Sequence, residues 1–162
     1  TLRSWGATPA CLSQKAVLPI DNQRALSYKT STPSGYKTRA HVLGVVQATF
    51  GNQGDHTHFV LQIGQKATDN LEIIYNREFG ELPALKVGDQ VDGCGDYITS
   101  TQQNGPYPPS PMGAILHWVH ENPNGRGHES GFLVINNTLY GWVSKVTAGF
   151  LPEQLNFSSV NR

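Results

Sequence analysis

One segment late in the chain, residues 113–131, holds a large share of the side chains that carry chemistry. Half of the six histidines in the sequence lie there, beside one of only three tryptophans. Imidazole binds metals and exchanges protons near neutral pH, whereas indole and guanidinium groups supply stacking and charge. The composition of this segment predicts that it forms the functional part of the protein, and its candidate residues are His117, Trp118, His120, Arg126 and His128.

Two further histidines lie about sixty residues earlier, where apolar and polar side chains alternate. In residues 56–64 the alternation places Phe59 and Ile63 on one face of a strand and His56 and His58 on the other. The polar face of this strand therefore carries two imidazoles. A small closed sheet would bring them next to the later segment, and this meeting is the central expectation from the sequence.

Three imidazoles brought together in this way can hold zinc or copper. Residues three apart on a regular strand point to opposite faces, so His117 and His120 are not expected to bind one metal together. His120 is expected to share its face with Trp118 and Leu116, and His117 with Val119. No two-histidine helix motif or Cys/His finger occurs in the sequence. A hydrogen-bonded network that fixes the loop is therefore the structural alternative, and the metal and cofactor content stay open.

Hydrolysis is a further alternative for the same histidines. The run Arg126-Gly127-His128 resembles a short segment of some nucleases, in which a histidine activates water and a metal stabilises the leaving oxygen. Only three residues match, and the sequence has no nucleophile elbow, P-loop or Cys–His nucleophile signature. A metal-dependent phosphodiester hydrolase thus remains an alternative, and no catalytic residue is identified.

Short strands must position these side chains. The first expected strand carries Val42, Val46 and Phe50 on one face, and its interior Gly44 marks a bend. Pro-rich residues 100–111 form a long loop. Five strands with this spacing favour an all-β, five-stranded OB-like barrel, with an antiparallel β-sandwich as the alternative. The expected strands are residues 41–51, 56–64, 70–76, 88–99 and a fifth from residue 114, followed by a C-terminal hairpin over residues 132–135 and 139–143.

The domain organisation expected from these patterns has three parts. An N-terminal arm without sustained periodicity spans residues 1–39, the barrel domain spans residues 40–145, and a C-terminal tail spans residues 146–162. The arm is expected to hold only short extended or one-turn pieces, because prolines interrupt it. Cys11 and Cys94 are the only cysteines. They permit one disulfide, which would tie the arm to the barrel.

The composition limits which classes of protein the chain can belong to. The chain has 162 residues, 38% hydrophobic and 15% charged, with equal numbers of acidic and basic side chains. Net neutrality argues against tight binding to long nucleic acid, and no run approaches the roughly 20 apolar residues of a membrane-spanning helix. The sequence begins at Thr1 without an initiator Met. Together with the cysteine pair, this favours an exported protein, periplasmic or secreted, whose signal peptide has been removed.

Three segments together resemble a known family. They are His56-x-His58-Phe59, then Leu85-x-Val87-Gly88-Asp89-x-Val91 with Gly95-x-Tyr97, then Ile115-x-His117-Trp118-x-His120 with Pro123-x-Gly125-Arg126-x-His128. Over residues 40–143 the chain resembles a small bacterial family of exported proteins that is described only as a domain of unknown function. It departs from the family pattern at Tyr75-Asn76, at Asn122-Pro123 and at the inserted Gly127. The resemblance implies an OB-like fold and export, and it carries no activity.

A binding role unites these expectations. OB barrels bind ligands on the face of their second and third strands and through the neighbouring loops, with aromatic, polar and cationic side chains. We therefore expect a binding module for a short nucleotide-, oligonucleotide- or sugar-like ligand. Packing against Leu116 and Phe59 is the structural alternative for Trp118, and a module that contacts a host or envelope protein is the functional one. The expected ligand-binding residues are His56, His58, Tyr75, Tyr97, His117, Trp118, His120, Arg126 and His128.

Overall fold

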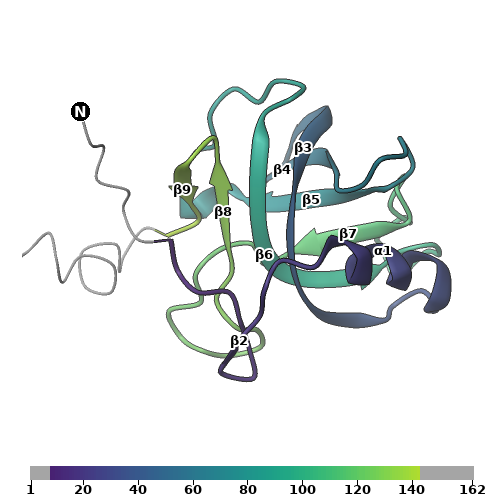
Figure 1. Ribbon diagram of the computed structural model, residues 1–162, viewed down its shortest axis with the longest axis horizontal. Coiled ribbons are helices and arrows are strands. Elements are labelled where there is room, and N and C mark those ends of the chain that lie inside the picture. Colours follow the sequence, from purple (N-terminus) through teal and green to yellow (C-terminus); the bar gives the residue numbers. More distant parts are fainter. Residues whose placement is uncertain (1–7, 143–162) are drawn as a thin grey trace, which may run out of the picture.

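The computed structural model describes residues 8–142, and its regular elements are mainly β-strands (Figure 1). The all-β class expected from the sequence is confirmed. The elements in chain order are β1 (Leu12–Ser13), β2 (Ala16–Val17), α1 (Asn22–Ser31), β3 (Lys37–Gln53), β4 (His56–Gln62), β5 (Asn70–Asn76), the 3-10 turn η1 (Arg77–Phe79), β6 (Gln90–Thr99), β7 (Ala114–His117), β8 (Phe132–Ile135) and β9 (Thr138–Tyr140).

Five of these strands pair in a ring. β3 pairs with β4, β4 with β5, β5 with β7, β7 with β6, and β6 pairs back with β3. All of these pairs are antiparallel except β5–β7, which is parallel. This order fits the OB-like architecture predicted from the sequence, in which β4 and β5 are the second and third ring strands. The expected hairpin is present as β8 and β9, and it extends the sheet from β6.

The ring closes because β3 is long enough to serve two neighbours. Its first half pairs with β6 and its second half with β4. At Gly44 an added Cβ would lie 2.1 Å from the carbonyl oxygen of Gln62, so only glycine fits where the strand bends. Two register shifts follow, and they reset the alternation of faces. The expectation that Phe50 shares the inward face of Val42 is therefore wrong, since Phe50 is 41% exposed.

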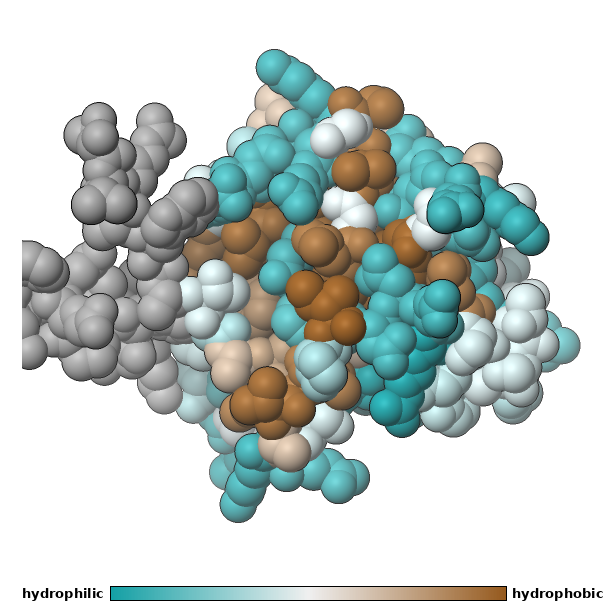
Figure 2. All heavy atoms as spheres, viewed as in Figure 1, coloured by the Kyte–Doolittle hydropathy of each residue, from teal (hydrophilic) through white to brown (hydrophobic). Residues whose placement is uncertain are grey.

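The core fills the inside of the ring with aliphatic and aromatic side chains from all five strands. Phe59, Leu71, Ile73 and Leu116 are fully buried, as the alternation in their strands predicts. On the outside, hydrophobic residues gather toward the middle of the face in Figure 2, and hydrophilic residues border them. No helix among residues 8–142 is long and apolar enough to span a membrane.

The N-terminal arm is more ordered than the sequence predicts. It contains the ten-residue helix α1, whose first turn is capped by the Asp21 carboxylate, an acceptor for the Arg24 N–H. The sequence of the arm shows no regular repeat of apolar residues, because α1 buries only Ala25 completely. The expected disulfide is present and joins Cys11 to Cys94 on β6. The predicted C-terminal tail, residues 146–162, lies outside the described residues.

Candidate functional site

Histidines from distant parts of the chain meet on the outer face of the ring. His58 on β4 pairs with Ile74 on β5 and points away from the core, because its neighbours Thr57 and Phe59 point inward. His56 lies on the same outer face, and its ring centroid is 5.7 Å from that of His117 at the end of β7. The sequence expectation that the two histidine segments come together is therefore confirmed.

Trp118 turns the chain at the end of β7. Its φ angle is 51°, in the left-handed region that a bulky side chain rarely adopts. The regular alternation stops there, so the expected faces are wrong: Trp118 stacks on His117, with ring centroids 4.3 Å apart, instead of sharing the face of Leu116. Val119 is fully buried in the core. This turn places indole and imidazole side by side, and backbone strain of this kind is concentrated at functional sites.

A pinned loop brings two more imidazoles into the group. The rings of His120 and His128 are perpendicular and their centroids are 5.2 Å apart. The Asn122 side chain donates hydrogen bonds to the carbonyl oxygens of Arg126 and His128, which holds the loop between the two histidines. We refer to His56, His58, His117, His120 and His128, which are linked by ring contacts directly or through Trp118, as the histidine cluster.

The hydrogen bonds of three cluster histidines define which ring nitrogen carries the proton. Nδ1 of His120 lies 2.7 Å from the carbonyl oxygen of Glu121, and Nδ1 of His128 lies 2.8 Å from that of Glu129. A carbonyl oxygen only accepts, so both Nδ1 atoms donate and the neutral rings keep a lone pair on Nε2. Nδ1 of His58 makes the equivalent contact, 2.8 Å long, with the Glu72 carboxylate.

Burial and crowding keep the inner histidines neutral. Burial, followed by the nearby imidazoles of His56 and His120, lowers the pKa of His117 to about 4. Burial also lowers the pKa of His120, and the hydrogen bond to the carbonyl of Glu121 only partly opposes it. Neutral imidazoles are hydrogen-bond acceptors and metal ligands. At neutral pH the cluster therefore presents lone pairs and not charge at these two positions.

Glu72 is the buried carboxylate of the site. Burial alone would raise its pKa, but hydrogen bonds from His58 and from the Ser110 hydroxyl outweigh burial and lower the pKa of Glu72 overall. Ser110 belongs to the Pro-rich loop, so this contact holds the loop over the outer face of β5. The ionised carboxylate in turn fixes the orientation of the His58 ring.

Two of the predicted ligand-binding residues are corrected by the structure. Tyr75 and Tyr97 are fully buried in the core, where the hydroxyl of Tyr75 donates to the carbonyl of Gly80 and that of Tyr97 bonds with Thr99. Neither side chain reaches a ligand on the surface. Arg126 is exposed on the loop, and among the described residues its side chain makes no hydrogen bond or ion pair.

Sequence reasoning missed several neighbours of the cluster. Phe79 of η1 stacks on His120 with ring centroids 3.9 Å apart. The ammonium of Lys37 lies 4.5 Å from the centroid of the Trp118 ring and 3.3 Å from the Asp96 carboxylate. These residues come from η1, β3 and β6, and only the closure of the ring brings them to the site. Their sequence surroundings contain no signal that would have identified them.

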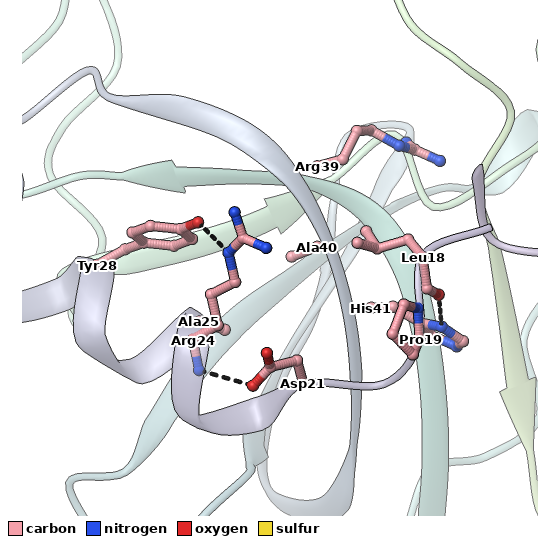
Figure 3. Close-up of a pocket in the computed structure, with 9 residues that line it drawn as sticks. All are labelled: Leu18, Pro19, Asp21, Arg24, Ala25, Tyr28, Arg39, Ala40 and His41. Carbon is pink, nitrogen blue, oxygen red and sulfur yellow. Dashed lines mark hydrogen bonds between the residues drawn. The ribbon is translucent and has the colours of Figure 1, made fainter. Parts of the chain in front are cut away.

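The close-up in Figure 3 shows a pocket elsewhere on the protein, between α1 and β3. Its volume is about 10 Å³, room for one water at most. His41 lines it, with its ring held between the Leu18 carbonyl and the Asp92 carboxylate. None of the cluster histidines lines this pocket. Within residues 8–142, no group of three or more His, Cys, Asp or Glu side chains is arranged to hold a metal ion.

Fold and site together define the class: an all-β protein with an OB-like ring of five strands and a histidine–aromatic cluster that extends from β4 to the end of β7 and the loop after it. Comparison with models of protein families and with curated proteins gives no match to this chain.

Proposed function

We propose that the protein is an exported binding module, and that it takes a short nucleotide-, oligonucleotide- or sugar-like ligand at the histidine cluster. The observation that carries this proposal is the contact between His56 and His117, because it joins the two histidine segments on one outer face. That face includes β4 and β5, the strands with which OB barrels bind their ligands, together with the end of β7. Export, and membership of the exported family that the sequence resembles, are parts of the same proposal.

The chemistry of the cluster suits a ligand that donates hydrogen bonds. The oriented Nε2 atoms accept from hydroxyl or amino groups, which sugars and bases both carry. Trp118 already contacts His117 and Lys37, so it stands as a rigid wall of the site. Exposed Arg126 on the adjacent loop is placed to meet a phosphate at the rim.

A ligand panel tests the proposal. Nucleotides, short single-stranded DNA and RNA, and oligosaccharides are titrated into the purified protein by calorimetry. We expect one class to bind, and we expect His56→Ala and Trp118→Ala each to weaken that binding at least about tenfold, since stacking and a hydrogen bond each contribute about 1–3 kcal/mol. Val87→Ala, at a position 77% exposed and outside the cluster, is the matched control. No binding by any class would favour a protein-interaction module instead.

The second candidate function is metal-dependent hydrolysis of a phosphodiester, and the His58–Glu72 pair favours it. A carboxylate on Nδ1 orients an imidazole so that Nε2 can take a proton from water. The pair is short, 2.8 Å, and both side chains are largely buried. Incubation with a labelled oligonucleotide, with and without chelator, separates the two candidates. Turnover that disappears with chelator and in His58→Gln would establish the hydrolase, and intact oligonucleotide would leave the binding role.

A further inference from the structure

Whereas the Glu72 carboxylate fixes the ring of His58, main-chain carbonyl oxygens fix the rings of His120 and His128. Each ring donates its Nδ1 proton to a main-chain carbonyl oxygen, so each Nε2 lone pair points away from that anchor. Metal-binding histidines almost always donate their other N–H to a carbonyl or carboxylate in this way, because the bond fixes the tautomer and the orientation of the ring. Of the residues in the histidine cluster, these two also lie at the two ends of one loop.

The spacing of the two rings matches shared coordination. Two imidazoles that bind one metal at a tetrahedral angle, with metal–nitrogen distances of about 2.0–2.1 Å, have ring centroids about 5 Å apart. The observed separation between the rings of His120 and His128 is 5.2 Å, with the ring planes at 89°. The separation of the two rings is therefore the one expected for imidazoles that share a metal.

The surroundings hold the pair in place. Phe79 stacks on one face of His120 with its ring nearly parallel, at 13°. The main-chain N–H of Gly131 donates to the carbonyl of His120, which closes the base of the loop. The hydrogen bonds from Asn122 hold the opposite end of the loop beside His128. A site whose supports exist before the ligand arrives loses little entropy on binding.

We propose that His120 and His128 bind a divalent late transition metal, copper, nickel or zinc, through their Nε2 atoms, with water in the remaining coordination positions. The inference goes beyond the proposed ligand-binding function and does not depend on it. Within residues 8–142, no third His, Cys, Asp or Glu side chain is arranged to join the pair.

The ligand atoms select the class of metal. Imidazole nitrogen suits copper, nickel and zinc, whereas magnesium and calcium require oxygen ligands. Glu129, the acidic residue that follows His128, is engaged elsewhere, because its Oε1 accepts from the main-chain N–H of Gln14. Copper should bind most tightly, as the order of stabilities for divalent metals dictates.

The test titrates Cu²⁺ into the complete chain without an affinity tag, followed by calorimetry and by electron paramagnetic resonance. We expect one equivalent to bind, with a spectrum showing two nitrogen ligands. His128→Gln should lower the affinity at least about tenfold, since even outer-shell changes cost metal sites about 10–100-fold, and should leave one nitrogen in the spectrum. His128 is partly exposed, so this variant is expected to fold, which circular dichroism checks.

His41→Gln is the matched control, because His41 lies outside the cluster with both ring nitrogens engaged. It should bind Cu²⁺ as the parent protein does, and Mg²⁺ should bind to neither. Equal affinity of the parent and His128→Gln, or an equal loss in His41→Gln, would overturn the inference. The titration contains no organic ligand, so its outcome is separate from that of the ligand panel.

Discussion

At the scale of single residues, two histidines show how the surroundings shift the pKa of the same side chain in opposite directions. Burial lowers the pKa of both. At His41 the hydrogen bonds with the Asp92 carboxylate and the Leu18 carbonyl outweigh burial and raise the pKa overall. At His117 the neighbours are imidazoles of the cluster, which add to burial and lower the pKa to about 4. His41 thus forms a structural pair with Asp92 that favours its protonated ring, whereas the ring of His117 is neutral at neutral pH.

The first prediction concerns His117 and acid. Its pKa is about 4 in the folded protein and 6.5 in its ordinary environment, so the unfolded chain binds the proton more readily. The contribution of the neutral His117 ring to the free energy of unfolding is therefore complete above pH 6.5. It is lost as the pH falls toward 4. The loss should reach about 2–3 kcal/mol. Urea unfolding at pH 7 and at pH 4.5 should show a smaller difference for His117→Gln than for the parent; equal differences would contradict this account.

The second prediction concerns His41 and has the opposite sign. Its folded pKa is raised, so its contribution to stability is full below its unfolded pKa and is lost as the pH rises through its folded pKa. His41→Gln should therefore lose more stability at pH 5.5 than at pH 8.5, by about 1 kcal/mol for a hydrogen bond to a charged partner. Paired urea titrations of the variant and the parent measure the difference. A loss that is independent of pH would mean that the pair with Asp92 is not ionic.

At the scale of elements, the site depends on how closely β6 approaches the end of β7. At Gly95 an added Cβ would lie 2.4 Å from the carbonyl oxygen of His117 and 2.8 Å from the Val119 side chain. A backbone oxygen cannot move aside without breaking the strand pairing between Asp96 and His117. Gly95 therefore sets the position of His117, the first histidine of the later segment, although it does not belong to the histidine cluster.

Gly95→Ala is the third prediction. Overpacking against backbone should destabilise the protein by about 2–3 kcal/mol or more, and it should displace His117. The matched control is Gly93→Ala on the same strand, where the added Cβ would meet the tip of Leu116 at 3.1 Å and that of Leu133 at 3.5 Å. Side-chain tips can yield, so its cost should be clearly smaller. Thermal unfolding of both variants gives the comparison, and equal losses would show that the approach of the His117 carbonyl does not matter.

The elements also show where sequence reasoning succeeds and where it stops. Alternation correctly placed His56 and His58 outside and their neighbours in the core, because one pleat governs the whole of β4. Tyr75 alternates with Leu71 and Ile73 along β5, so its burial was readable in the sequence even though it was predicted to be a ligand contact. Alternation failed at Trp118, where a single left-handed residue reset the faces.

Contacts between elements could not be predicted from the sequence for a different reason. Phe79 reaches His120, and Ser110 reaches Glu72, only because the closed ring brings η1 and the Pro-rich loop to the same face. No local pattern encodes such a meeting, since it depends on the pairing of every strand at once. Helix α1 was missed because it buries only Ala25 completely, which leaves little apolar period to detect.

At the scale of the whole molecule, the N-terminal arm is bound to the barrel at several points. The disulfide joins Cys11 to β6, and the Arg39 guanidinium links the arm to the later loop, because it donates to the carbonyls of Leu12 and Ser130. Farther along, the ammonium of Lys29 on α1 donates to the carbonyl of Asn70 on β5. These contacts join the first described residues to the ring and to the loop that carries His128.

The fourth prediction is that reduction of the disulfide weakens the fold as a whole. The bridge spans 83 residues of sequence, so breaking it frees a long loop in the unfolded chain and should cost about 2–4 kcal/mol. For a domain of this size that loss lowers Tm by about 5–15 °C. Calorimetry with and without reductant measures it, and the Cys11→Ala/Cys94→Ala double variant, which should match the reduced protein and ignore reductant, is the control. An unchanged Tm in protein shown by mass spectrometry to be reduced would mean that the noncovalent contacts of Arg39 and α1 hold the arm by themselves.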